Sequence, residues 1–265
     1  MTLIESLPLP LLFIALILPC LLLGIGGAWL VKNLGWQANA ADKDAIVLTH
    51  AFAGMLYAVA LGLMVINVQS SYSEVKMVVM QEANLTENLF IDASGLEGAS
   101  GTDIQALARN YAEDVIGEWE SIGRRNDSSL PSHESVENLT LRILNYQPLS
   151  ARDQIIYAEV LSGLNDMLDQ RRERLHLGRD SMGAVAWLIV ILGAFITIGM
   201  TWFYPTESDR TRYLLVGTMG LMFGLMIFLI VVMDHPLLGG FRVESASFEE
   251  ALLDMQDWQQ RLNDF

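Results

Sequence analysis

The chain has 265 residues, of which 52% are hydrophobic and 18% are charged, and its formal net charge is −15 at pH 7. This composition is too apolar for an ordinary soluble domain and too charged for a chain that lies wholly within a membrane. The strong negative charge argues against nucleic acid and anionic lipid headgroups as binding partners.

Four segments are long and apolar enough to span a bilayer, whose hydrocarbon core of about 30 Å requires about 20 apolar residues. They contain no Asp, Glu, Lys or Arg and cover residues 9–31, 46–68, 183–204 and 213–233. Backbone groups left unpaired in lipid cost several kcal/mol each, so these segments should be helices. We therefore predict an all-α integral membrane protein with four transmembrane helices.

The first segment could instead be a signal peptide, because Ala38, Asn39 and Ala40 form a typical small-residue cleavage site. A signal peptide has a basic leader and a shorter apolar stretch, whereas Glu5 is the only charge ahead of this long run. A transmembrane helix is the better interpretation. Cys20 lies in the same segment and is the only cysteine, so no intramolecular disulfide is possible.

The second segment carries small residues at four-residue spacing. The row consists of Gly54, Ala58 and Gly62, and Ile66 continues it. One interpretation is close helix packing through small residues. The other is that the row lines an axial pore in a ring of subunits, where an apolar constriction gates ions by dewetting. In that case His50 lies near the outer mouth, and the helix becomes polar from Asn67 onward.

The same helix is expected to continue past the membrane to about residue 93. Its extension carries four acidic residues, Glu74, Glu82, Glu87 and Asp92. They could surround a vestibule that concentrates cations, with Glu74 and Glu82 as its main members. They could equally form a solvated face or pair with arginines of the returning helix, in which case Glu82 would meet Arg171 or Arg174.

The region between the second and third spans is predicted to be a helical bundle. We expect helices over residues 103–123 and 132–146, and a long one that Ser150 caps and that continues directly into the third span. Basic residues near the membrane ends are slightly more numerous on the side of this insert, which predicts that the insert and both termini are cytoplasmic. The predicted parts are residues 1–69, 70–182, 183–234 and 235–265, of which the second and fourth are cytoplasmic.

The fourth span ends at Asp234, His235 and Pro236. A charge at this depth requires water or a partner, and a proline ends a helix. These residues could form a gate or a subunit contact. Alternatively, the helix simply ends there and Asp234 pairs with an arginine of the cluster that includes Arg171 and Arg174.

No catalytic constellation is apparent, so we do not expect an enzyme, a metal site or a cofactor. The four histidines are far apart and lack metal-binding spacing, and the glycines of the first span are not followed by the Lys-Ser or Lys-Thr of a phosphate loop. The spans also lack Asp and Glu, which argues against a proton-driven stator subunit.

Several short motifs resemble those of the bacterial bestrophin-like membrane proteins, in order, over residues 46–250. They are residues 72–75 (Tyr-Ser-Glu-Val), 81–84 (Gln-Glu-Ala-Asn), 118–119 (Glu-Trp), 171–175 (Arg-Arg-Glu-Arg-Leu) and 234–236 (Asp-His-Pro), together with Trp187, Gly193 and Thr197. The resemblance implies a pentameric ion channel in which each second helix lines an axial pore with an apolar neck. Carried over, it places Ala58, Gly62 and Ile66 at the neck, where bestrophins have bulkier side chains.

The resemblance does not extend to calcium gating, because the acidic residues after the last span are dispersed, at Glu244, Glu249, Glu250 and Asp254. We therefore expect a homo-oligomer, most simply a pentamer, that conducts inorganic ions across a bacterial inner membrane. The alternative is a non-conducting scaffold or sensor whose insert binds a cytoplasmic protein.

Overall fold

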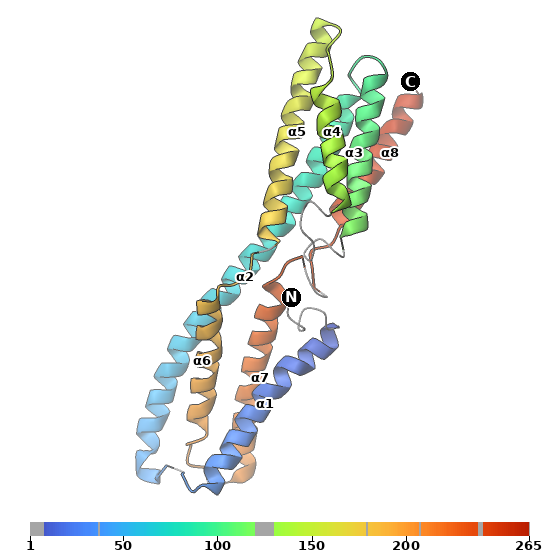
Figure 1. Ribbon diagram of the computed structural model, residues 1–265. Helices are drawn as coiled ribbons and strands as arrows, with labels where there is room; N and C mark the ends of the chain where they lie inside the picture. The colour runs from blue at the N-terminus through green and yellow to red at the C-terminus, as the bar shows by residue number, and fades with distance from the viewer. Residues whose placement is uncertain are drawn as a thin grey trace. The chain divides into compact units, whose positions relative to one another are not determined.

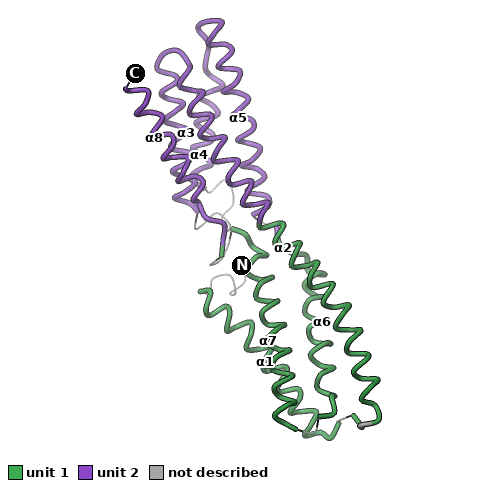
Figure 2. Tube along the Cα trace, turned by 180° about the vertical axis from the view of Figure 1, so that it is seen from behind, with its two compact units in different colours: residues 1–72, 181–241 green, residues 73–180, 242–265 purple. Residues whose placement is uncertain are grey.

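The computed structural model describes residues 8–36, 38–119, 130–178, 180–206, 208–237 and 241–264. All regular elements in these ranges are helices, which confirms the all-α prediction. The chain forms two compact units, residues 1–72 with 181–241 and residues 73–180 with 242–265 (Figure 2). One helix, α2 (Lys43–Ala93), contributes to both units.

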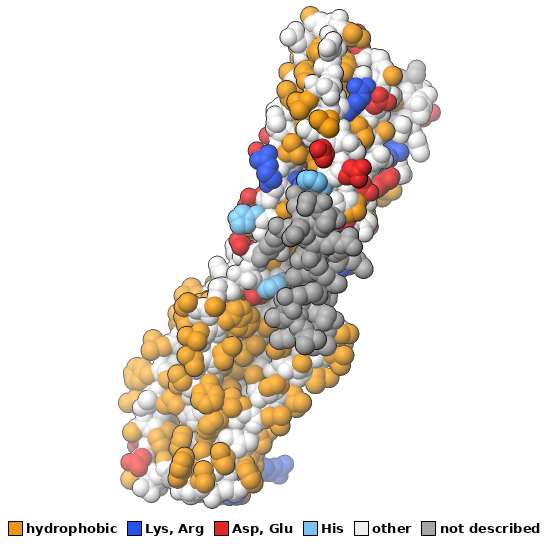
Figure 3. Space-filling model, viewed as in Figure 1, with side chains coloured by type: hydrophobic (Ala, Val, Ile, Leu, Met, Phe, Trp, Pro, Cys, Tyr) orange, Lys and Arg blue, Asp and Glu red, His pale blue; other side chains and the backbone are white. Residues whose placement is uncertain are grey.

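Unit 1 contains the four helices that are long and apolar enough to span a membrane (Figure 1). They are α1 (Leu9–Asn33), the first part of α2, α6 (Ala184–Thr201) and α7 (Asp209–Met233), so the four predicted spans are confirmed. Hydrophobic side chains cover most of the visible face of this unit, whereas charged side chains gather on unit 2 (Figure 3). A short 3-10 helix, η1 (Ala40–Asp42), precedes α2.

Glycines allow the helices of unit 1 to approach closely. A Cβ atom at Gly220 of α7 would lie 2.7 Å from the carbonyl oxygen of Cys20, and one at Gly224 would lie 3.0 Å from Ile17 Cα. A Cβ atom at Gly193 of α6 would lie 2.1 Å from the ring of Tyr57. Small residues at these contacts allow the van der Waals packing that drives helix association in membranes.

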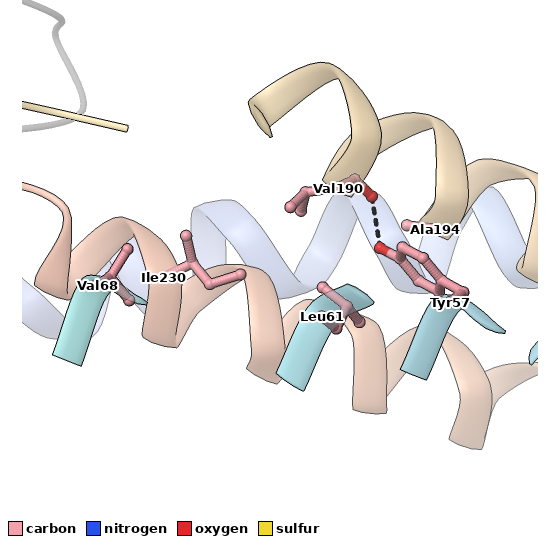
Figure 4. Close-up of a cluster of buried hydrophobic side chains, with 6 residues drawn as sticks. All are labelled: Tyr57, Leu61, Val68, Val190, Ala194 and Ile230. Carbon is pink, nitrogen blue, oxygen red and sulfur yellow. Dashed lines mark hydrogen bonds between the residues drawn. The ribbon is translucent and has the colours of Figure 1, made fainter. Parts of the chain in front are cut away.

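The core of unit 1 lies where α2, α6 and α7 meet (Figure 4). It is formed by six buried side chains, Tyr57, Leu61, Val68, Val190, Ala194 and Ile230. The Tyr57 hydroxyl donates a hydrogen bond of 2.5 Å to the carbonyl oxygen of Val190. This bond satisfies a polar group that would be expensive to leave unpaired in an apolar core.

Unit 2 contains the second part of α2 and four further helices. These are α3 (Ala99–Glu118), α4 (Pro131–Leu144), α5 (Ala151–Leu177) and α8 (Ala246–Asp264). The Ser150 hydroxyl accepts a hydrogen bond of 3.1 Å from the backbone N–H of Asp153, which confirms the predicted cap of α5. The continuation of α5 into the third span is wrong, because α5 ends at Leu177 and α6 begins only at Ala184.

Helix α8 was not among the predicted elements. Its buried residues, Phe248, Ala251 and Met255, share one face of the helix. The Phe248 ring packs edge-on against Tyr111 of α3, with ring centroids 6.5 Å apart. Just before this helix, the Val243 carbonyl accepts a hydrogen bond of 2.8 Å from the Trp119 indole N–H. The C-terminal segment is therefore an integral part of unit 2.

Candidate pore face and buried charge cluster

The small-residue row lies outside the packed face of α2. The packed face of the span carries Tyr57, Leu61 and Val68, all less than 9% exposed. Each residue of a helix is rotated by about 100° from the one before it, so residues four apart do not lie exactly in line. The row therefore drifts away from the packed face, from half-buried Gly54 to Ile66 on the opposite side of the helix. Ile66 is 64% exposed.

No part of the described chain packs against the two glycines of this row. A Cβ atom added at Gly54 or at Gly62 would have no neighbouring atom within 4 Å. This distinguishes them from Gly193 and Gly220, which contact other helices closely. Close packing of small residues therefore explains those two glycines but does not explain this row within one chain.

The exposed surface of α2 changes its chemistry abruptly after Ile66. Before that point it carries large apolar side chains, Phe52, Met55, Leu56, Val59 and Leu63, each more than half exposed. From Asn67 to Glu74 the exposed positions are polar, at Asn67, Gln69, Ser70, Ser71, Ser73 and Glu74. A helix that lines a pore and continues from the hydrocarbon region into water needs such a change from an apolar to a polar surface.

The two candidate vestibule carboxylates lie in different environments. Glu74 is exposed. Glu82 is 0% exposed, so it cannot line an aqueous vestibule, and that part of the prediction is wrong. Instead Glu82 Oε2 accepts a hydrogen bond of 2.5 Å from Arg174 Nε, and Glu82 Oε1 accepts one of 3.1 Å from Arg174 Nη2. The predicted contact between Glu82 and one of the two arginines is confirmed, with Arg174 as the partner.

Aromatic side chains complete the surroundings of this ion pair. The Tyr111 hydroxyl donates a hydrogen bond to Glu82 Oε1, and the Arg174 guanidinium lies 5.8 Å from the centroid of the Trp119 ring. Burial, together with the negative charge of Glu82, holds the pKa of Tyr111 well above its usual value. Burial alone would lower the pKa of Arg174. The attraction of Glu82 outweighs this effect, so the pKa lies above its ordinary value. Tyr111 therefore stays a donor and Arg174 stays charged.

A second buried carboxylate, Glu118, caps the start of α4. Its two oxygens accept hydrogen bonds from the Ser132 backbone N–H, at 3.0 Å, and from the Ser132 hydroxyl, at 2.7 Å. Burial raises the pKa of Glu118, and these two bonds partly oppose that effect. Arg171, on α5, is also buried, with 5% exposed.

Asp234 joins the end of α7 to the start of α6. It accepts a hydrogen bond of 2.6 Å from the Met182 backbone N–H and one of 3.2 Å from the Trp187 indole N–H. His235 Nδ1 lies 3.5 Å from the same carboxylate. The carboxylate thus has partners within unit 1 and does not depend on the arginine that we considered from the sequence. Pro236 is buried and lies just beyond the end of α7.

His50 lies on the packed face of α2, the face that also carries Tyr57, and not on the exposed face that carries Ile66. Its ring meets the Tyr204 ring edge-on, with centroids 5.7 Å apart. Both side chains line a cavity in unit 1 together with Arg212. Sequence reasoning overlooked this cavity, because the turn between α6 and α7 brings its residues together.

Within the part of the chain that the structure describes, no group of three or more His, Cys, Asp or Glu side chains is placed to hold a metal ion. The acidic residues that follow the fourth span do not converge on one point. Glu249 accepts a hydrogen bond of 2.8 Å from the Ser245 hydroxyl, and Glu250 and Asp254 lie on the exposed side of α8.

Comparisons with known proteins agree on one family and one fold. The family described as having a Bestrophin-like domain matches residues 19–248. Two mutants of a bacterial bestrophin homologue from Klebsiella pneumoniae have similar structures, with TM-scores of 0.67 and 0.65 at 13% and 12% sequence identity. A mutant described only as a membrane protein has a TM-score of 0.69 at 12% identity. Each similarity covers 93% of this chain and 98% of the other. Among curated proteins, none matches the chain.

Proposed function

Because the chain belongs to the bestrophin-like family, we propose that it forms a homopentameric ion channel with an axial pore lined by α2. The family assignment made from the sequence motifs is confirmed by the match over residues 19–248. Family members are known as ion channels, and the four apolar helices give the chain the character of a membrane protein. Five copies and the pore itself follow from the resemblance and are part of the proposal.

The observation that carries this proposal is the uncovered face of α2. A Cβ atom at Gly62 would have no neighbour within 4 Å among the residues that the structure describes, and Ile66 is 64% exposed. In a ring of subunits such a face can line the axis, with Ala58, Gly62 and Ile66 at an apolar neck and Asn67 at the start of a polar funnel. Glu74 is exposed further along the helix and would attract cations to that funnel.

We place the channel in a bacterial inner membrane with unit 2 and both termini on the cytoplasmic side. This orientation rests on the slight excess of basic residues beside the insert. The functional division of the chain is then residues 1–69 and 183–234 in the membrane and residues 70–182 and 235–265 outside it. Asp234, His235 and Pro236 would stabilise the cytoplasmic end of α7, and Arg171 and Arg174 the core of the cytoplasmic part.

The competing function is a non-conducting scaffold whose unit 2 binds a partner protein. Exposed apolar side chains at the end of α4 and the start of α5 favour it. Leu144, Leu149 and Ile155 are 56%, 72% and 74% exposed. Isolated exposed apolar residues are common on protein surfaces, but a group of this kind can also bind another protein. In a pentamer the same group could meet a neighbouring subunit.

Current through single channels in planar bilayers, under a KCl gradient, tests the proposal. Gly62→Phe should abolish the current while the oligomer keeps its size, because a bulky ring would obstruct the neck. Gly26→Phe is the matched control. Gly26 also lies in a membrane helix, and a Cβ atom there would have no neighbour within 4 Å in the described part of the chain, so this substitution should leave the current unchanged.

The other outcomes assign the row a different role. Dissociation of the oligomer by Gly62→Phe, but not by Gly26→Phe, would show that the row packs against another subunit. Silence of an intact wild-type oligomer across voltage, pH and calcium concentration would favour the scaffold.

A further inference from the structure

Unit 1 contains a cavity of about 160 Å³ whose wall is mostly apolar, with Leu215, Val216 and Met219 among its residues. Five side chains add polar groups to this wall. Thr201 lies at the end of α6 and Thr206 in the connection after it, and the other three are His50 from α2, Tyr204 from the same connection, and Arg212 from the first turn of α7. The cavity is separate from the row on α2 that we propose as the pore face, and its interpretation does not depend on conduction.

Arg212 is the unusual member of this cavity. Its side chain is only 3% exposed, and its Nε donates a hydrogen bond of 3.0 Å to the Thr206 hydroxyl. Its buried Nη1 has no hydrogen-bond partner among the described residues. The carboxylate one turn earlier, Asp209, attracts Arg212 electrostatically, but its ion pair is with Lys32 and it does not fill the hydrogen-bonding capacity of Nη1. A buried guanidinium whose hydrogen-bonding capacity is not filled is unfavourable, particularly beside lipid.

His50 adds a second nitrogen without a partner to the same cavity. Its Nδ1 is buried and has no hydrogen-bond partner in the described part of the chain. An imidazole donates from Nδ1 in one neutral tautomer and in its protonated form. Two donors, one of them permanently charged, therefore line one small space. A carboxylate has two acceptor oxygens and a negative charge, which match these donors.

The size and the wall of the cavity define the rest of the ligand. An apolar protein cavity of about 150 Å³ holds one benzene molecule, which has six heavy atoms. A halide ion would fill only a small part of such a space and would leave the wall of Leu215 and Val216 without contacts. We infer that this cavity binds a small monocarboxylate of about six heavy atoms, with its carboxylate at Arg212 and His50 and its short hydrocarbon body against the apolar wall.

Binding of sodium butyrate to the purified full-length protein tests this inference. The protein is reconstituted in nanodiscs of zwitterionic lipid, and affinity is measured by isothermal titration calorimetry. Butyrate should bind saturably and should raise the unfolding temperature, whereas its neutral amide and sodium chloride at equal ionic strength should do neither. Arg212→Gln should weaken binding about tenfold or more, because a charge-assisted hydrogen bond is lost.

The matched control is Arg210→Gln, which removes the same charge from an exposed position two residues away and should leave affinity unchanged. Arg212→Lys keeps the charge without the planar fork and should give an intermediate affinity, so it serves if Arg212→Gln does not fold. His50→Gln should weaken binding a few-fold.

Three results would overturn the inference. Equal responses to butyrate and its amide would remove the role of the charge. Unchanged affinity in both Arg212 variants would place the ligand elsewhere. Loss of butyrate binding when the nanodiscs contain anionic phospholipid would identify a lipid phosphate as the occupant of the cavity.

Discussion

Glu82 of α2 and Arg174 of α5 form a doubly hydrogen-bonded ion pair in which both side chains are 0% exposed, although 92 positions separate them in the sequence. Tyr111 adds a third hydrogen bond to the carboxylate. Charges buried in this way require each other, because neither has access to water.

Removing one member of this pair should destabilise unit 2 strongly. Glu82→Gln leaves the Arg174 charge buried and uncompensated, so we expect the free energy of unfolding to fall by about 3–5 kcal/mol in urea titrations in detergent micelles. Glu82→Met combined with Arg174→Met should recover much of this loss, because it removes both charges.

Asp169→Asn is the control for the buried pair. It breaks the ion pair with Arg172, whose side chain is 71% exposed, and should change stability by less than about 1 kcal/mol. Equal effects of Glu82→Gln and Asp169→Asn would contradict the burial of the Glu82 pair.

Glu87 should make the stability of unit 2 depend on pH. Burial and, to a smaller extent, the nearby charges of Asp254 and Glu250 raise the pKa of Glu87 above its ordinary value of 4.5. A carboxyl group whose pKa is raised on folding stabilises the protein below its unfolded pKa. That contribution is lost as pH rises through the folded value.

Glu87→Gln does not titrate, so relative to wild type it should raise the unfolding temperature more at pH 7 than at pH 4. The side chain is partly exposed to water, and the difference should therefore stay below about 1 kcal/mol. Scanning calorimetry at the two pH values measures it. A gain of the same size at both values would exclude titration of Glu87 as the cause.

Asp234→Ala should weaken the contact between the C-terminal end of α7 and the N-terminal end of α6. The substitution removes the acceptor for the Met182 N–H and for the Trp187 indole N–H. Buried donors left without acceptors cost about 1–3 kcal/mol each, so the unfolding temperature should fall clearly. Asp209→Ala, at the other end of α7, removes an exposed ion pair with Lys32 and an attraction to Arg212 without a hydrogen bond, and should have a smaller effect. A larger loss from Asp209→Ala would refute this assignment.

Gly220 and Gly62 should respond oppositely to alanine. At Gly220 the new methyl group would lie 2.7 Å from the Cys20 carbonyl oxygen, and overpacking of this kind costs about 1–3 kcal/mol. At Gly62 it would have no atom of the described residues outside its own turn of helix within 4 Å, and alanine is the better helix former by about 1 kcal/mol. Thermal unfolding of the monomeric form in a harsh detergent compares them. Destabilisation by Gly62→Ala under these conditions would mean that the row packs within the chain.

The membrane helices could be predicted from the sequence because an uninterrupted apolar run is a one-dimensional signal. The cap of α5 at Ser150 was likewise visible, since a capping hydroxyl acts on the backbone only a few residues away. Contacts between segments that are distant in the sequence could be predicted only in part. The sequence offered both Arg171 and Arg174 as partners for Glu82, and only the packing of unit 2 selects Arg174 and adds Tyr111.

Three features could not be read in advance. The break between α5 and α6 contains no proline, so the pattern suggested one continuous helix. Helix α8 buries only one narrow face, at Phe248, Ala251 and Met255, within a strongly charged segment. The orientation of His50 toward Tyr204 depends on the path of the connection between α6 and α7, which hydrophobic periodicity does not describe.

The glycine contacts between α1 and α7 have a consequence for how the chain enters the membrane. Helix α1 emerges from the ribosome before α7, but the partner that fits against it through Gly220 and Gly224 is α7. At about 5–20 residues per second, synthesis of the intervening chain takes on the order of tens of seconds. During this interval α1 resides in the bilayer, or beside the insertion machinery, without its native neighbour, so assembly of the membrane unit has to be completed after translation of the fourth span.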